Sequence, residues 1–134
     1  MPERLTFDSE AILAFYLGEE GGEVVRDYLE KVQSREIEGY INVLNLTEIY
    51  YILCRVDQRV AEEKQRNLRL YGLQIVPVED DGLWREAAQV KASHSLSLAD
   101  AFAVATAHSL KSKLVVGSDK EVDGIDIKLL RIRV

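Results

Sequence analysis

The sequence lacks the features that mark disulfide-stapled and membrane-spanning proteins. It contains one cysteine, Cys54, so an internal disulfide is excluded and a reducing compartment, the cytoplasm, is expected. No run of about 18 consecutive apolar residues is present, so no membrane span is predicted. The apolar run of a signal peptide does not follow Met1. The two prolines and eight glycines punctuate the chain without forming a linker or a low-complexity tract.

Positive charge is also in short supply. The chain has 17 lysines and arginines against 23 aspartates and glutamates, which gives a net charge of −6. This balance argues against a protein that holds nucleic acid on a broad basic surface. It does not exclude a nucleic-acid enzyme, because bound cations reverse the local charge of carboxylates. With 47% hydrophobic and 30% charged residues, the composition is that of an ordinary globular protein, and we expect a single domain over residues 1–134.

The spacing of apolar residues predicts strands that alternate with helices along the chain. Strands are predicted at residues 4–7, 39–43, 73–78 and 114–117, with a last strand inside 127–134. Helices are predicted at residues 10–17, 22–32, 45–56, 58–71, 81–93 and 98–110. This order predicts an α/β fold of three layers, α/β/α, around a mostly parallel central sheet of about four to five strands.

The rest of the chain is organised around residues 96–119. The predicted helix at 98–110 is apolar on nearly every side, which indicates a buried helix, and Ser97 is its expected N-cap. Asp100 falls in the first turn of this helix, and Asp119 falls just after the strand that follows. Ligands of open α/β sheets bind outside the carboxyl ends of the strands. We therefore expect both carboxylates near a binding crevice.

Two further acids occupy comparable junctions. Asp8 ends the first predicted strand, and Glu48 lies in the first turn of the helix after the second strand, three residues after its expected cap, Asn45. Together with Asp100 and Asp119 they are expected to converge above one edge of the sheet. Crowded carboxylates repel one another, and hard cations such as Mg²⁺ or Mn²⁺ relieve that repulsion by binding their oxygens. Such a site favours hydrolysis of a phosphate ester.

Each acid also has a purely structural interpretation. Glu48 and Asp100 stand three residues after possible N-cap residues, and negative charge near a helix start stabilises the helix. Asp8 and Asp119 suit turns between a strand and a helix. Capping and metal binding are compatible, so both interpretations stay open.

Four pieces of the sequence carry a resemblance to a known family. They read DSEAILAFYLGEEG at Asp8, NVLNLTEIYYIL at Glu48, LSLADAFAVATAH at Asp100 and LVVGSDKEV at Asp119. With these pieces the chain resembles the PIN-domain family, and within it the VapC-type toxins of bacterial and archaeal toxin–antitoxin pairs, over residues 5–132. It departs from the family at Val122, where an aromatic residue is common, and at Glu10, where small residues commonly follow the first acid.

The resemblance implies a metal-dependent endoribonuclease that acts on an RNA substrate. Carried over by position, Asp8, Glu48, Asp100 and Asp119 would hold Mg²⁺ or Mn²⁺, and Ser118 would orient a carboxylate or a water. The resemblance also implies a parallel sheet with helices on both sides and a homodimer. Its implied partner is a small antitoxin protein whose tail lies in a groove between the early helices.

Two other functions compete with this interpretation. The apolar residues of segment 12–17 and of the next helix favour a non-catalytic domain that holds a small protein. Asp8 at the end of the first strand would also suit an aspartyl-phosphate enzyme. Those enzymes need a second aspartate two residues later, and here that position is Glu10.

Overall fold

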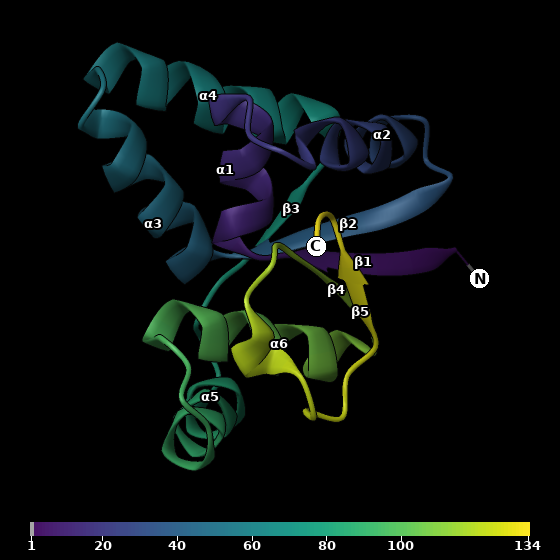
Figure 1. Cartoon of the computed structure of the whole chain (residues 1–134), viewed down its shortest axis with the longest axis vertical. Coiled ribbons are helices and arrows are strands. Elements are labelled where there is room, and N and C mark those ends of the chain that lie inside the picture. Colours follow the sequence, from purple (N-terminus) through teal and green to yellow (C-terminus); the bar gives the residue numbers. More distant parts are fainter. Residues whose placement is uncertain (1) are drawn as a thin grey trace.

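The computed structural model describes residues 2–134, which form a five-stranded, all-parallel sheet with the strand order β3-β2-β1-β4-β5 (Figure 1). The strands are β1 (Glu3–Phe7), β2 (Ile37–Asn42), β3 (Gln74–Val76), β4 (Lys113–Val116) and β5 (Leu129–Arg131). The helices are α1 (Ser9–Leu17), α2 (Gly22–Gln33), α3 (Val43–Cys54), α4 (Gln58–Tyr71), α5 (Asp81–Ser93), α6 (Leu98–Leu110) and the short 3-10 helix η1 (Lys120–Val122). The predicted fold class is confirmed.

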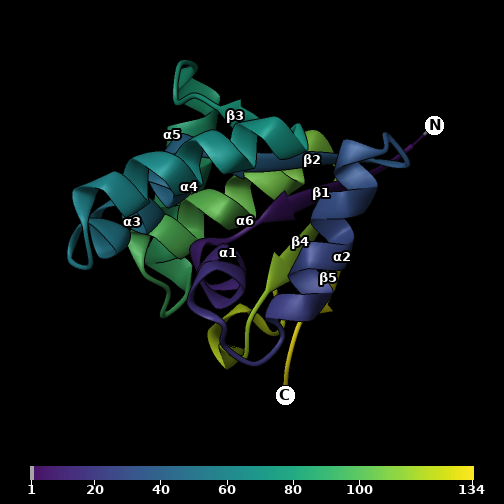
Figure 2. The ribbon, with the colours of Figure 1, turned by 90° about the horizontal axis from the view of Figure 1, so that it is seen from above.

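The helices cover both faces of the sheet (Figures 1 and 2). The chain passes from β1 to β2 to β3 in one direction, and parallel crossovers are right-handed, so α1–α4 lie on one face. It then returns from β3 to β4 on the other side of β1, which places α5 and α6 on the opposite face. There α6 packs on β1, β2 and β4, and α5 packs on α6.

Successive side chains of β1 point to opposite faces of the sheet, so this strand contributes to the core on both sides. Leu5 and Phe7 are buried in the cluster beneath α1–α4. Thr6 points to the other face, where its hydroxyl shares a hydrogen bond of 2.6 Å with Ser112, which lies between α6 and β4. Helix α6 is buried at every residue from 101 to 107, as its apolar sequence predicts. No helix within residues 2–134 is long and apolar enough to span a membrane.

The junction between β2 and α3 corrects one prediction. The strand ends at Asn42 and the helix begins at the next residue, so Asn42 is the N-cap, and its Oδ1 accepts the Leu44 N–H at 2.8 Å. The predicted cap, Asn45, lies inside the helix and is fully buried. The predicted capping pair of Asn45 and Glu48 is therefore wrong, and Glu48 lies in the second turn. Both asparagines suit a cap locally, and both make tertiary contacts: Asn42 with Thr106, and Asn45 with Ser9 and Ala99.

Other boundaries shift by a few residues. The strand predicted at 73–78 shortens to β3, because Pro77 has no N–H to donate and β3 is an edge strand. The strand predicted at 114–117 ends at Val116, and the one predicted inside 127–134 is β5. Helix α1 begins one residue early, at Ser9, because Asp8 caps it.

Candidate metal centre

The candidate centre lies where the chain reverses its direction across the sheet. From β1 the chain moves to β2 on one side, and from β4 it moves to β5 on the other side. The carboxyl ends of β1 and β4 therefore flank a topological switch point, the usual ligand position in open α/β sheets. Asp8 directly follows β1, and its N–H donates to Val115 O of β4 at 3.1 Å. Asp119 follows β4 and is the N-cap of η1.

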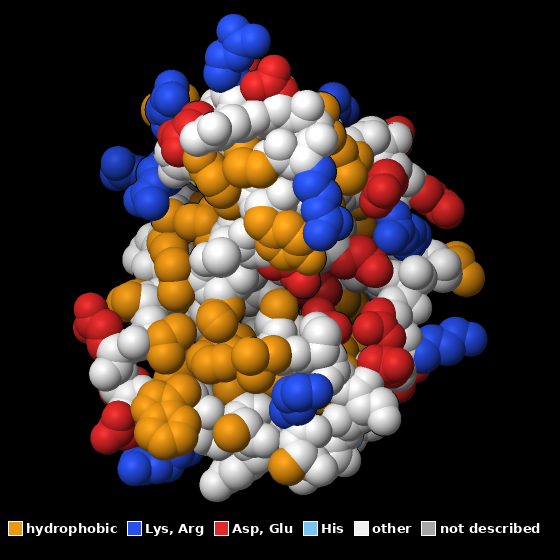
Figure 3. All heavy atoms as spheres, turned by 90° about the vertical axis from the view of Figure 1, so that its left-hand side faces the viewer, with side chains coloured by type: hydrophobic (Ala, Val, Ile, Leu, Met, Phe, Trp, Pro, Cys, Tyr) orange, Lys and Arg blue, Asp and Glu red, His pale blue; other side chains and the backbone are white. Residues whose placement is uncertain are grey.

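Helix N-termini add positive potential at the same edge. Asp8 is the N-cap of α1, where its Oδ1 accepts the Ala11 N–H at 2.8 Å. Asp100 lies in the first turn of α6, whose cap is Ser97 as predicted. The Ser97 hydroxyl accepts the Asp100 N–H at 3.1 Å. These helix starts favour negative groups, whether carboxylates or phosphates. On the face shown in Figure 3, acidic side chains gather near the middle, beside a broad hydrophobic area.

The electrostatics of Asp8 show that several acids lie around it. Asp8 is only 6% exposed. Burial raises the pKa of its carboxyl well above the ordinary value, the Ala11 N–H opposes this shift, and the charges of Asp100, Glu10 and Glu48 raise the pKa further. An ionised Asp8 is therefore costly in this environment.

Asp100 has the same kind of environment in a milder form. Burial of this half-buried carboxyl raises its pKa, and a hydrogen bond with Ser97 lowers it. The charges of Asp119, Glu48 and Glu10 raise it again. The charges of Glu48 and Glu10 thus act on both Asp8 and Asp100, and the charge of Asp119 acts on Asp100.

Glu10 is the acid that sequence reasoning did not include in the site. Its Oε1 accepts the Ser118 N–H at 2.8 Å, across 108 residues of chain. Two features of the sequence could have indicated Glu10: it lies two residues after Asp8, and it stands where the family commonly has a small residue. Ser118, which was predicted to orient a carboxylate or a water, contributes its backbone N–H to this contact. Its hydroxyl makes no hydrogen bond within residues 2–134, so its role stays a prediction.

Asn45 joins the three helices that begin at the site. Its Nδ2 donates to Ser9 Oγ of α1 and to Ala99 O of α6, each at 3.1 Å. Its Oδ1 is buried and has no hydrogen-bond partner within the described part of the chain. An unpaired buried acceptor is rare, since it costs about 1–3 kcal/mol. The same side chain contacts Ser9 and Ala99, the residues next to Asp8 and Asp100, so a water O–H or a cation bound there would satisfy this oxygen.

The donor set suits a hard cation. The site offers carboxylate oxygens, and both histidines are engaged elsewhere: His94 with Val90 O, and His108 with Glu86 Oε2 at 2.7 Å. Oxygen donors select Mg²⁺ or Mn²⁺ over zinc. Among residues 2–134, however, no three acids, histidines or cysteines already stand in a metal-binding group. Neighbouring acids are near enough to raise the pKa of Asp8 and of Asp100, but within the described residues they are not drawn together as ligands.

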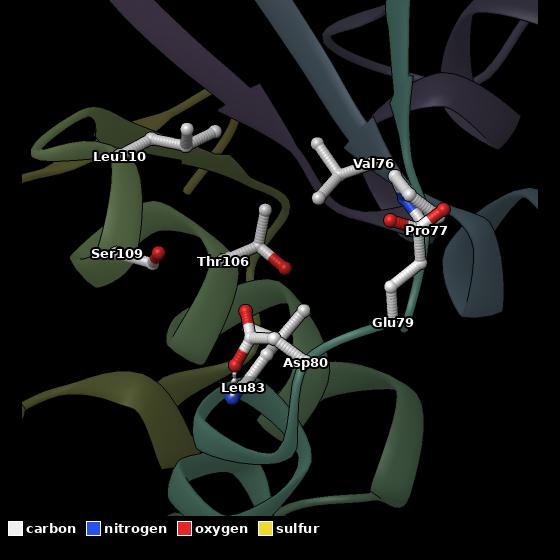
Figure 4. Close-up of a pocket in the computed structure, with 8 residues that line it drawn as sticks. All are labelled: Val76, Pro77, Glu79, Asp80, Leu83, Thr106, Ser109 and Leu110. Atoms are coloured by element: carbon white, nitrogen blue, oxygen red, sulfur yellow. Dashed lines mark hydrogen bonds between the residues drawn. The ribbon is translucent and has the colours of Figure 1, made fainter.

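A separate hollow of about 210 Å³ lies between the end of β3, the start of α5 and α6 (Figure 4). Thr106, Ser109 and Leu110 face Val76 and Pro77 across it. Its aspartate, Asp80, caps α5 by accepting the Leu83 N–H at 2.9 Å. None of the four predicted acids lines this hollow, so it is distinct from the candidate centre.

One family model matches this chain over most of its length. It is described as the PIN domain and covers residues 5–128. The chain belongs to the PIN-domain family. The resemblance carried by the four sequence pieces is therefore confirmed, and PIN domains are typically nucleases.

Solved structures similar to this PIN domain include chains of toxin–antitoxin complexes. A toxin–antitoxin complex from Klebsiella pneumoniae matches at 16% identity and a TM-score of 0.69, over 97% of this chain and 95% of the other. VapBC2 from Rickettsia felis, bound to a DNA fragment from its promoter, matches at 12% identity and a TM-score of 0.72, over 96% of this chain and 98% of the other. FitAcB from Neisseria gonorrhoeae matches at 17% identity and a TM-score of 0.70, over 96% of this chain and 97% of the other. At these identities the likeness is one of fold. No curated protein gives a significant match.

Proposed function

We propose that this PIN domain is a metal-dependent endoribonuclease, the toxin of a type II toxin–antitoxin pair in the cytoplasm. The observation that carries the proposal is the environment of Asp8. Its carboxyl is buried at the switch point, and both burial and the charges of Asp100 and Glu48 disfavour its ionised form. A cation among these acids would remove that penalty. Family membership supports nuclease chemistry over other uses of the same site.

Four carboxylates would hold the cation, Mg²⁺ or Mn²⁺: Asp8, Glu48, Asp100 and Asp119. When bound, such a cation lowers the pKa of a water and neutralises charge on the phosphate and on the leaving oxygen. The chain itself supplies the positioning. The Ala11 N–H holds one oxygen of Asp8, and the starts of α1 and α6 favour the anionic phosphate. Ser118 is the proposed hydroxyl that orients a carboxylate or a water.

The reaction proposed is hydrolysis of an RNA phosphodiester that leaves a 5′-phosphate. The test is cleavage of a single-stranded RNA by the purified protein with Mn²⁺, with Mg²⁺ and with EDTA. We expect cleavage that needs the metal and falls at least about 100-fold in Asp8→Asn and Asp100→Asn. Asp57→Asn is the matched control, because it makes the same charge change at the N-cap of α4, away from the site. Cleavage that survives in both site variants would contradict the proposal.

A small antitoxin protein is the proposed partner, and a homodimer is the proposed assembly. The names of the similar solved structures support an antitoxin, since they are toxin–antitoxin complexes. Exposed apolar side chains on the early helices also support it: Leu17 is 44% exposed and Val24 38%. The competing function is a catalytically inactive PIN domain that only binds this partner. Metal-dependent cleavage by the chain free of any partner would exclude that alternative.

A further inference from the structure

The backbone that carries Asp119 loses its sheet contacts just before that residue. β4 ends at Val116, whose carbonyl accepts the Ile132 N–H at 3.0 Å. After this point come Gly117, Ser118 and Asp119, here called the 117–119 segment. Within residues 2–134, no backbone hydrogen bond joins the 117–119 segment to β5. Side chains from distant parts of the sequence hold it instead.

Arg131 of β5 holds the segment from one side. Its Nη1 donates to Gly117 O at 3.1 Å and to Asp119 O at 2.8 Å. Its Nη2 forms an ion pair with the Asp123 carboxylate beyond η1. One guanidinium therefore fixes two carbonyls of the segment and the turn that follows. The planar, always charged guanidinium suits this task, whereas the ammonium of lysine lacks its fork of donors.

Glu10 of α1 holds the segment from the other side. Its Oε1 accepts the Ser118 N–H at 2.8 Å and lies 3.6 Å from Nη2 of Arg133. A Cβ at Gly117 would stand 1.4 Å from this same oxygen. Only glycine at position 117 therefore leaves room for the Glu10 carboxylate. A side chain at position 117 would displace the Glu10 carboxylate from the Ser118 N–H.

We infer that Glu10 and Arg131 are positioning residues that fix the 117–119 segment from two sides and so place the Asp119 carboxylate at the metal centre. The inference rests on the proposed function for the role of Asp119. We assign Glu10 a role through the Ser118 N–H, since its Oε1 accepts that N–H and lies 3.6 Å from Nη2 of Arg133. Arg131 acts through the two carbonyls.

Glutamine and alanine at position 10 separate positioning from ligation. Glu10→Gln keeps an oxygen that accepts the Ser118 N–H but removes the charge, and Glu10→Ala removes both. A positioning role predicts Mn²⁺ affinity close to wild type in Glu10→Gln and about 10- to 100-fold weaker in Glu10→Ala, the usual cost of losing a group that orients a ligand. Gly117→Ala displaces the Glu10 side chain and should match Glu10→Ala. An equal, large loss in Glu10→Gln and Glu10→Ala would overturn the inference in favour of Glu10 as a ligand.

The hydrogen-exchange rate of the Ser118 amide, measured in the full chain, tests the same variants without metal or RNA. Losing its acceptor in Glu10→Ala should speed exchange about tenfold or more, while Glu10→Gln stays near wild type. Arg131→Lys, which keeps the charge, should also speed it and weaken Mn²⁺ binding. Glu30→Gln on α2, an exposed partner of Arg26, is the control and should change neither. Unchanged exchange in both Glu10→Ala and Arg131→Lys would overturn the inference.

The two measurements also separate this inference from the proposed function. A wild-type chain that binds no Mn²⁺ would contradict the proposed metal centre. The exchange of the Ser118 amide would still decide whether Glu10 and Arg131 hold the segment. Melting curves of each variant establish that it is folded under the conditions of the measurement.

Discussion

The burial of a carboxyl among other acids at the candidate centre lowers the stability of the metal-free protein. Asp8 is buried with other acids around it, and the hydrogen bond that lowers the pKa of its carboxyl comes from the Ala11 N–H. Functional sites commonly carry such unfavourable charges, and substitutions that remove them stabilise the protein while destroying its activity. The stability of the metal-free protein therefore tests the environment of Asp8 independently of any substrate.

Asp8→Asn should stabilise the metal-free protein at pH 7, by an amount on the order of 1 kcal/mol. Asparagine keeps the N-cap oxygen and removes the buried charge. Because folding raises the pKa of Asp8, the folded wild type binds its proton more tightly than the unfolded chain. Wild-type stability therefore rises as pH falls through the raised folded pKa, and the advantage of the Asp8→Asn variant shrinks until the unfolded carboxyl is also protonated. Urea denaturation with EDTA at several pH values measures this, and a variant less stable than wild type at pH 7 would contradict it.

Asn42 is the residue whose importance the sequence did not reveal. Its Oδ1 caps α3, and its Nδ2 donates to the buried Thr106 Oγ1 of α6 at 2.9 Å. Asn42→Ala should lower the free energy of unfolding by about 2–3 kcal/mol, because it removes a cap and a buried hydrogen bond together. Thr47→Ala removes an exposed side-chain hydrogen bond from the same helix and should cost less than about 0.5 kcal/mol. A similar loss of unfolding free energy in both variants would show that the buried hydrogen bond of Asn42 stabilises the protein no more than the exposed one of Thr47.

At the scale of elements, local patterns predicted most helices and strands, and contacts between elements decided what they missed. Helix α6 and its Ser97 cap follow from a run of apolar residues after a good capping residue. Asn42 and not Asn45 caps α3, and Asn42 also donates to Thr106, which is 64 residues away. Glu10 joined the site through Ser118, which is 108 residues away. No local pattern contains either partner.

The turn between α1 and α2 gives a prediction at this scale. Gly21 has φ +89°, and a Cβ there would stand 2.5 Å from the backbone oxygen of Ile132. Gly21→Ala should destabilise the protein by about 2–3 kcal/mol, through backbone strain and this contact. Gly124 has a similar φ of +84° with open space around it, so Gly124→Ala isolates the strain alone and should cost about 1 kcal/mol. Denaturant unfolding measures both variants, and an equal loss of unfolding free energy in the two would show that the turn does not pack against the C-terminal segment.

At the scale of the whole molecule, the strand order creates the candidate centre. The sequence predicted alternating strands and helices but not the order β3-β2-β1-β4-β5, which puts the switch point between β1 and β4. The junctions between strands and helices grouped the four acids, and the family resemblance favoured metal binding over capping, which the periodicity alone had left open. The net charge of −6 is consistent with a protein whose nucleic-acid chemistry depends on bound cations.

Metal binding should stabilise the whole molecule. A ligand that binds only the folded state at about 100 times its Kd adds roughly 2.7 kcal/mol, which corresponds to a rise in Tm of roughly 10 °C for a domain of this size. We expect Mn²⁺ to raise the Tm of wild type and of Asp57→Asn, and to raise that of Asp8→Asn or Asp100→Asn much less. A uniform rise in all of these proteins would indicate binding elsewhere.

We propose that acids distant in the sequence hold a cation at the switch point of the sheet. The most direct measurement is an anomalous difference map from a crystal of the protein grown with Mn²⁺. We expect a strong peak between the carboxylates of Asp8 and Asp100, with Glu48 and Asp119 turned toward it. A bound Mn²⁺ located only elsewhere, for instance beside Glu79 and Asp80, would contradict it.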